Sequence, residues 1–371
     1  MTGANEGAMQ NDFASDYPPN PALQDQLREI VRDALHAGDA PGATIALMTD
    51  GSLVWNAGVG HRDMSRLEPL AVDAGFYLYS ITKIFLAIAI LRLTEEGRLA
   101  LDDPIQNVLP EAPFAELVTL RQLLNHTSGL PDYGALPEYE RDVRERPGQP
   151  WSADAFLAHS LRRGFRFPPG EGWAYSNIGM MLVRQAIERT VRGSLREALD
   201  DLVFRPVGLR QTVVAESLHD SDRLTAGYTT QLDADGALRD MAARYHPGWV
   251  AHGVAISTAA DLARALDALF AGRLLTAESL RTMMEAVPVP AAHPQFVRPG
   301  YGLGLMIDLG SRYGLVAGHG GGGPGYSTAA FHFSDVRGHR VTSVALVNRD
   351  QPELATPIAF ALVTAYADHL G

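Results

Sequence analysis

Stretches typical of β-strands lie near both ends of this 371-residue chain, and a mostly helical stretch separates them. Near the start, two such stretches flank Asp50-Gly51, a strong signal for a hairpin. Near the end, alternating or apolar runs cover residues 303–309, 328–333 and 341–348. The most economical fold joins both ends in one antiparallel sheet with helices packed on it. We therefore predict an α/β (α+β sandwich) fold with a helical insertion.

Helical periodicity supports the same division of the chain. The run at residues 81–96 is apolar on all sides, so this helix should be buried. Further helices are expected at residues 23–35, 118–125, 152–163, 177–190, 194–204, 258–271, 277–286 and 353–369. We predict N- and C-terminal helices flanking the sheet. The predicted domains are a flexible tail at 1–20, a sheet domain formed by 21–98 and 245–371, and a helical domain at 99–244.

Composition narrows the class of protein. A hydrophobic content of 46% with 20% charged residues is typical of a soluble globular chain. The net charge of −12 argues against a nucleic-acid partner, and the absence of cysteine excludes a thiol nucleophile and disulfides. Neither a signal peptide nor an apolar membrane span is visible. We expect a cytoplasmic protein, although a periplasmic or secreted form with its signal removed would look the same. The oligomeric state is not indicated.

Lys83 is the only lysine, against thirty arginines, and it follows Ser80 by three residues. Arginine keeps its proton in proteins, whereas a desolvated lysine can become a base. Three residues make about one helical turn, so the hydroxyl and the amine would share one face. The S-x-x-K spacing therefore predicts a serine nucleophile activated by lysine. Codon bias that left one lysine by chance would explain the same pattern.

Two further segments carry polar groups suited to acyl transfer. A Pro-Gly turn precedes Tyr175 and Asn177, a Y-x-N pair in which the phenol can pass a proton and the amide can bind a substrate amide. The run from His319 through Gly321 and Gly322 is rich in glycine, so a substrate can approach its backbone and an N–H such as that of Gly322 can serve an oxyanion. A loop-capping tyrosine and a flexible turn are the plainer interpretations.

In this order, the three segments resemble the serine β-lactamase and penicillin-recognising enzymes, particularly the class C-like branch. That branch includes class C β-lactamases, D-alanyl-D-alanine carboxypeptidases, D-aminopeptidases and carboxylesterases. The similarity extends from about residue 43 to 365. Further matching runs are Leu99–Pro104, Leu123–Pro131, Arg205–Leu209, Ser257–Leu262 and Tyr301–Gly304.

The resemblance implies Ser80 as nucleophile and Lys83 as its first proton acceptor or electrostatic partner. It implies Tyr175 as the group that relays protons to the leaving group and later activates water. Asn177, His319 and Gly321 would bind the substrate, and the N–H groups of Ser80 and Gly322 would form the oxyanion hole. No cofactor or metal is implied. His126 is expected to have a packing or turn role, and Glu171 and His252 would line the cleft or face solvent.

One position departs from the β-lactamase pattern, because His319 stands where that branch usually has lysine. A neutral histidine binds a substrate carboxylate less well, although its ordinary pKa of about 6.5 leaves protonation within reach. Arg349 could replace the missing cation, or it could be an exposed arginine at a strand end. This departure favours ester or D-residue peptide substrates over β-lactams, so we expect a small-molecule ester, peptide or β-lactam-like substrate.

Other functional classes fit the sequence less well. A pyridoxal phosphate enzyme would use Lys83 as a Schiff base, but the order of its elements fits poorly. A catalytically silent binding module would need a lost nucleophile or base, and none is missing. An α/β-hydrolase needs a G-x-S-x-G elbow, which is absent, and the twelve histidines lack metal-ligand spacing.

Overall fold

The computed structural model describes residues 20–233, 235–351 and 354–371. Within these residues, the main element is an eight-stranded sheet in the order β2-β1-β13-β12-β11-β10-β9-β8, with every neighbouring pair antiparallel. The strands of this sheet are β1 (Gly42–Thr49), β2 (Ser52–Gly60), β8 (Val287–Pro288), β9 (Pro299–Tyr301), β10 (Met306–Asp308), β11 (Val316–Gly323), β12 (Tyr326–Val336) and β13 (His339–Val347).

The two ends of the chain meet in this sheet. β1 pairs with β13, so that Ala43 lies opposite Val347 and Thr49 opposite Val341. This pairing confirms that N- and C-terminal strands share one antiparallel sheet. The predicted tail at residues 1–20 lies outside the described residues except for Asn20, whose side chain caps the first helix.

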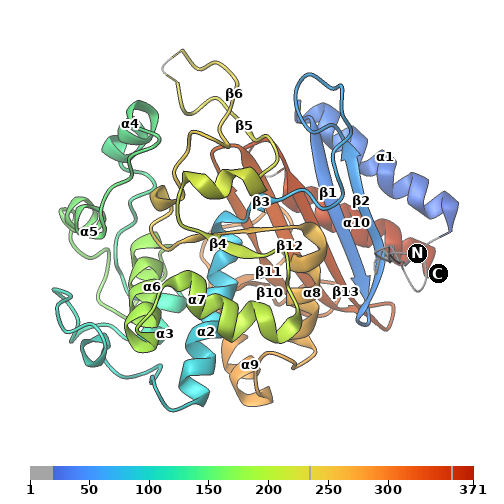
Figure 1. Cartoon of the computed structure of the whole chain (residues 1–371). Coiled ribbons are helices and arrows are strands. Elements are labelled where there is room, and N and C mark those ends of the chain that lie inside the picture. The colour runs from blue at the N-terminus through green and yellow to red at the C-terminus, as the bar shows by residue number, and fades with distance from the viewer. Residues whose placement is uncertain (1–19, 234, 352–353) are drawn as a thin grey trace, which may run out of the picture.

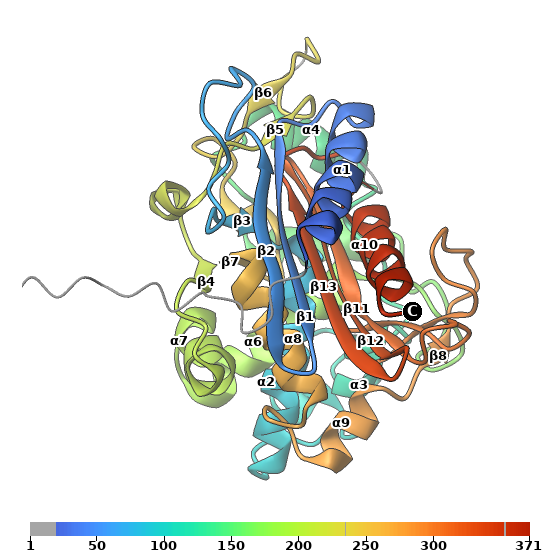
Figure 2. The same cartoon turned by 90° about the vertical axis from the view of Figure 1, so that its right-hand side faces the viewer.

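Helices cover both faces of the sheet (Figures 1 and 2). α1 and α10 pack on one face, while α8 and the buried α2 lie on the other. The helices are α1 (Pro21–Ala37), α2 (Thr82–Glu95), α3 (Leu120–Leu124), α4 (Pro137–Glu145), α5 (Ala153–Leu161), α6 (Asn177–Val191), α7 (Leu195–Leu199), α8 (Ala259–Phe270), α9 (Ala277–Met283) and α10 (Ala355–His369). Within the described ranges, none of them is long and apolar enough to cross a membrane.

The alternation of side chains along the strands explains why both faces are covered. Ile45 and Leu47 of β1 pack in the hydrophobic cluster under α1 and α10, whereas Ala46 and Met48 belong to the cluster on the opposite face. Because β1 carries apolar side chains on both faces, both faces of the sheet must be covered by other elements. The sheet is therefore the central layer of an α/β/α sandwich.

The helices α3 to α7 follow α2 in the chain; α6 and α7 pack against α2, and α3 and α5 pack against α6. A small sheet joins this region to the rest, because β7 (Val254–Ser257) pairs with both β3 (Phe76–Tyr77) and β4 (Val213–Ala215). One hydrophobic cluster includes side chains from all of these elements. The division into domains at residues 98/99 and 244/245 stays a prediction.

Some elements differ from the sequence-based expectation. The expected strand at residues 303–309 forms only at Met306–Asp308, and the expected helix at 194–204 is α7 followed by a π-helical turn at Asp200–Phe204. The largest difference is β11, because the sequence predicts no strand here and its glycine-rich half indicates only backbone that a substrate can approach. Glycine weakens strand propensity, so the pairing with β12 must supply the order.

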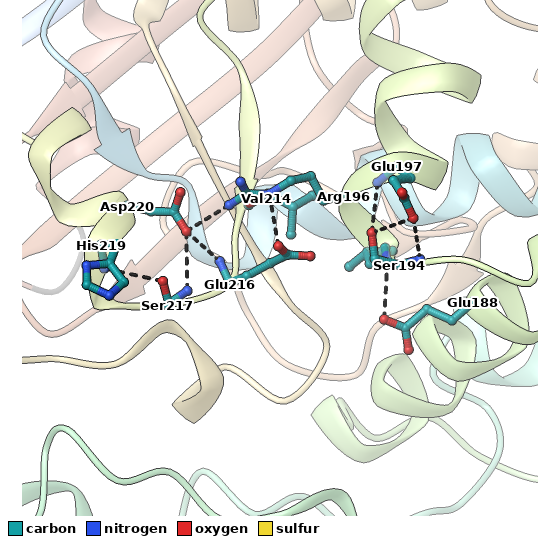
Figure 3. A network of polar contacts seen from close by, with 10 residues as sticks. Glu188, Ser194, Arg196, Glu197, Val214, Glu216, Ser217, His219 and Asp220 are labelled. Carbon is teal, nitrogen blue, oxygen red and sulfur yellow. Dashed lines mark hydrogen bonds and ion pairs between the residues drawn. The ribbon is translucent and has the colours of Figure 1, made fainter.

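A polar network fastens α7 to β4 (Figure 3). The Arg196 guanidinium donates to the Val214 carbonyl oxygen at 2.8 Å and to the Asp220 carboxylate at 2.7 Å, and it pairs with Glu216 at 3.3 Å. Asp220 in turn accepts the backbone N–H groups of Glu216 and Ser217. Because Asp220 is largely buried, it depends on these donors for its charge.

We predict that Arg196→Met lowers the free energy of unfolding by about 1–3 kcal/mol, because it leaves the partly buried Asp220 charge and a carbonyl oxygen with fewer partners. The matched control is Arg205→Met, since Arg205 pairs with Asp200 and Asp201 but is 68% exposed. That exposed pair should contribute little. Urea denaturation of the three proteins checks the difference, and equal midpoints for the two variants would contradict it.

Candidate active site

Ser80 lies in a single 3₁₀ turn, Tyr79–Ile81, that leads directly into α2. Tyr79 holds this turn, with a positive φ of 47° that a bulky residue rarely adopts. Its side chain is buried, and its hydroxyl donates to the Pro324 carbonyl oxygen at 2.5 Å. On the other side, the Leu78 N–H donates to the Ala255 carbonyl oxygen at 2.8 Å. Contacts to distant segments therefore fix the position of Ser80.

Two of the predicted residues, Lys83 and Tyr175, meet at the hydroxyl of the third, Ser80. Lys83 Nζ lies 2.9 Å from Ser80 Oγ, and the Tyr175 hydroxyl donates to the same oxygen at 2.9 Å. The Lys83 amine also lies 4.9 Å from the centre of the Tyr175 ring. Ser80 is partly exposed while Lys83 is fully buried, so a substrate can reach the hydroxyl without exposing the amine.

Burial changes the proton affinity of the amine. It lowers the pKa of Lys83 to about 7, although the Asp132 carboxylate acts in the opposite direction. A lysine with this pKa is half deprotonated at neutral pH and can accept a proton from a neighbouring hydroxyl. The N-terminal end of α2 carries a partial positive charge, which also disfavours the ammonium form.

Tyr175 has the opposite character. Burial raises the pKa of its phenol above the ordinary value of 10, and the hydrogen bond to Ser80 only partly offsets this effect. The phenol therefore holds its proton at neutral pH and acts as a hydrogen-bond donor. The arrangement offers one base, Lys83, and one acid, Tyr175, on the same serine oxygen.

Asn177 is the first residue of α6, directly after the helix cap Ser176, whose hydroxyl accepts the Gly179 N–H. The Asp132 carboxylate binds Asn177 twice, through the backbone N–H at 2.8 Å and through the side-chain amide at 3.3 Å. The amide nitrogen is thus held by the protein, which orients the side-chain oxygen.

The glycine-rich half of β11 lies directly on the turn that carries Ser80. A Cβ atom at Gly321 would come within 2.3 Å of the Leu78 carbonyl oxygen, and one at Gly323 within 2.5 Å of the Tyr79 ring. Glycine at these positions permits the close approach. At Gly322, by contrast, a Cβ would meet nothing within 4 Å. The strand thus brings the Gly322 backbone beside the Ser80 turn with open space around it.

One edge of this strand segment is unpaired among the described residues. β10 pairs with β11 only as far as Gly318, whereas β12 pairs with it up to Gly323. From His319 onward, the edge away from β12 therefore presents backbone groups that an extended ligand could bind.

His319 is buried, and both of its ring nitrogens form hydrogen bonds within the protein. Nε2 lies 2.8 Å from the Tyr301 hydroxyl, and Nδ1 lies 2.5 Å from the Gly320 carbonyl oxygen. The carbonyl oxygen can only accept, so Nδ1 carries the proton and Nε2 accepts from Tyr301. Burial and the charge of Lys83 lower the pKa of His319 to about 3. The expectation that His319 is readily protonated is therefore wrong for this environment.

The structure also decides three secondary expectations. His126 is buried with a φ of 63°, and its Nδ1 accepts the Ser176 N–H at 3.3 Å, which confirms a packing and turn role. Arg349 donates to the carbonyl oxygen and the carboxylate of Asp39, so the suggestion that it anchors a substrate carboxylate is wrong. Glu171 is exposed, whereas His252 is buried against Lys83.

Sequence reasoning missed two residues that hold the site. Asp132 orients Asn177, and Tyr301 binds His319. Asp132 directly follows the run Leu123–Pro131, and Tyr301 begins the run Tyr301–Gly304, both of which carry the family resemblance. Their partners are distant in sequence, so no local spacing could indicate these contacts.

Solved structures with a similar fold include two D-specific amide hydrolases. The D-amino acid amidase from Ochrobactrum anthropi SV3, complexed with D-phenylalanine, has a TM-score of 0.79 and 26% identity over 94% of this chain and 99% of that one. A D-stereospecific amidohydrolase from Streptomyces sp. has a TM-score of 0.76 and 28% identity over 92% and 98%.

Similar sequences include a penicillin-binding protein and an esterase. Penicillin-binding protein 4* of Bacillus subtilis is 29% identical over 317 residues, which cover 83% of this chain and 68% of that protein. Esterase EstB of Burkholderia gladioli is 33% identical over 205 residues, about half of each chain. A family model described as Beta-lactamase matches residues 27–367. This chain belongs to the beta-lactamase family.

Proposed function

We propose that this protein is a serine hydrolase that cleaves ester or amide bonds through an acyl intermediate on Ser80. One observation carries the proposal. The Ser80 oxygen lies 2.9 Å from both a buried amine and a buried phenol. The amine has a pKa of about 7, so a base is available at neutral pH. The esterase and the amidases among similar proteins support this class of reaction.

The proposed first step transfers the Ser80 hydroxyl proton to the Lys83 amine while Oγ attacks the substrate carbonyl carbon. The resulting oxyanion would bind the backbone N–H groups of Ser80 and Gly322, because β11 lies on the Ser80 turn at this point. When the tetrahedral intermediate collapses, the leaving group takes the Tyr175 proton, and the Lys83 ammonium returns a proton to Tyr175. Water then attacks the acyl group by the reverse sequence of proton transfers.

Substrate binding in this proposal uses the unpaired edge of β11 and the Asn177 side chain. The carbonyl and N–H groups of an amide substrate would pair with the segment from His319 to Gly322. Asn177, oriented by Asp132, would bind the same substrate through its side-chain amide.

The environment of His319 indicates which substrates suit the site. A neutral His319, with both ring nitrogens bound inside the protein, supplies no cation for a substrate carboxylate. We therefore infer a preference for esters and amides that carry no carboxylate over β-lactams and peptides with a free carboxylate. A class C-like β-lactamase is the alternative within the family.

We expect a fluorophosphonate probe to form one covalent adduct, detected by intact mass, on the native protein. The Ser80→Ala variant should form none, because the reactive oxygen is missing. Ser194→Ala is the matched control, since Ser194 caps α7 and should keep the adduct. An adduct that persists in Ser80→Ala would contradict the proposal, as would a folded native protein that does not react.

The rate of acylation should rise with pH through an apparent pKa of about 7. The sign follows from the lowered pKa of Lys83, because the amine is a base only above that value and the ammonium form predominates below it. Lys83→Arg should lower kcat/KM by about 100-fold or more, since arginine keeps its proton. Hydrolysis of p-nitrophenyl butyrate between pH 5 and 9 measures both effects. A flat profile across pH 7 would speak against Lys83 as the base.

A substrate panel tests the inferred preference. We expect higher kcat/KM values for p-nitrophenyl butyrate and D-alanyl-p-nitroanilide than for nitrocefin, which carries a carboxylate that His319 cannot pair with. If nitrocefin is the best of the three substrates, the β-lactamase alternative replaces our substrate assignment, although acyl transfer to Ser80 would stand.

A further inference from the structure

His252 contacts the amine that the proposed mechanism uses. It lies in the loop before β7, is 2% exposed, and places its ring Nε2 3.2 Å from Lys83 Nζ. The loop is far from α2 in sequence, so the fold brings the two side chains together. No step of the proposed mechanism requires this histidine, and nothing in the S-x-x-K pattern indicates it.

The contact constrains the protonation of both groups. An ammonium can only donate, so Nε2 must accept from Lys83 whenever the lysine is charged. Burial lowers the pKa of His252 well below its usual range, and the positive charge of Lys83 lowers it further. The ring therefore stays neutral and offers Lys83 an acceptor without adding a second positive charge.

The neutral form of the amine is the one that matters for catalysis. A neutral amine has two N–H groups and one lone pair. If one N–H donates to His252 and the other points to the Tyr175 ring, whose centre is 4.9 Å away, the lone pair is left for Ser80 Oγ at 2.9 Å. Without an acceptor at the His252 position, rotation about the terminal C–N bond would turn the lone pair away from Ser80.

We propose that His252 is a positioning residue that directs the lone pair of Lys83 toward Ser80. It acts through Lys83 and does not touch the substrate in this role. A neutral acceptor suits this role better than a carboxylate, because a negative charge at the same distance would stabilise the ammonium and remove the base at neutral pH. The inference rests on the proposed function of Lys83 as the base.

Other ionisable groups also surround the amine. Asp132 raises the pKa of Lys83. The positive charge of Lys83 in turn lowers the pKa of His126, in the loop after α3, and of His319 on β11. Tyr175 remains protonated. A test of His252 must therefore measure Lys83 itself and not activity alone.

The composition of the chain provides that measurement. Because Lys83 is the only lysine, protein labelled with ¹³C- and ¹⁵N-lysine and made without a lysine-containing tag gives one set of side-chain NMR signals. Their chemical shifts against pH report the pKa of Lys83 without any turnover. The rate of reaction with the fluorophosphonate probe then reports how well the amine activates Ser80.

We expect three substitutions at residue 252 to separate the effect of a hydrogen-bond acceptor from the effect of a charge next to Lys83. His252→Gln can place an acceptor near the Nε2 position and should keep the Lys83 midpoint near 7 and a reaction rate within about threefold of the native rate. His252→Leu lacks an acceptor and should slow the reaction about 10- to 100-fold. His252→Glu adds a negative charge and should raise the midpoint by about one unit or more, which moves the pH–rate profile in the same direction.

The control is His332→Leu, which removes a buried histidine on β12 that contacts Phe270 and Thr342 instead of Lys83. It should leave the Lys83 midpoint and the pH dependence unchanged. The proposal is overturned if His252→Leu reacts at the native rate, or if His252→Glu and His252→Gln share one midpoint. Because the Gln and Glu variants have nearly the same shape, their comparison decides even if the Leu variant does not fold. A native protein that fails to label at Ser80 would instead refute the proposed function.

Discussion

The site depends on one desolvated amine. Lys83 is fully buried, and the groups around it are a serine hydroxyl, a protonated phenol and three histidines whose pKa values burial lowers. A buried charge is costly, so the protein holds the amine near neutrality instead of pairing it directly with a carboxylate. Asp132 is close enough to raise the pKa but is bound to Asn177. The same burial that makes Lys83 a base keeps Tyr175 an acid.

The sandwich supplies the rigidity that this arrangement needs. The Ser80 turn is held by Tyr79, which reaches the β11–β12 connection, and by Leu78, which pairs with β7. β11 is in turn fixed by its ladder with β12, in the middle of a sheet packed on both faces. Two distant parts of the chain, β7 and the β11–β12 connection, therefore fix the turn that carries the Ser80 hydroxyl. A strained φ at Tyr79 can persist because these contacts outweigh its cost.

The sequence predicted the parts of this structure that local patterns determine. Periodicity located α1, α2, α6, α8 and α10 to within a few residues, and Asp50-Gly51 marked the β1–β2 hairpin. The S-x-x-K spacing placed Ser80 beside Lys83 because one helical turn fixes that distance. β11 was missed because glycine carries no strand signal, and its order comes from β12 and the Ser80 turn. Contacts such as Asp132 with Asn177, Tyr301 with His319 and His252 with Lys83 depend on tertiary structure, which no spacing encodes.

In the proposed function, His319 links the proton chemistry of the site to its choice of substrate. A lysine there would place a second cation near Lys83 and would lower the proton affinity of both groups, while offering a partner to a substrate carboxylate. The neutral histidine removes that partner and leaves Lys83 as the only group near Ser80, among those described above, whose charge changes near pH 7. The pKa of Lys83 then depends on two opposing effects, because burial lowers it and the Asp132 carboxylate raises it. For the proposed hydrolase, this charge balance favours an acyl substrate without a carboxylate, because binding such a substrate brings no negative charge near the amine that would have to lose its proton.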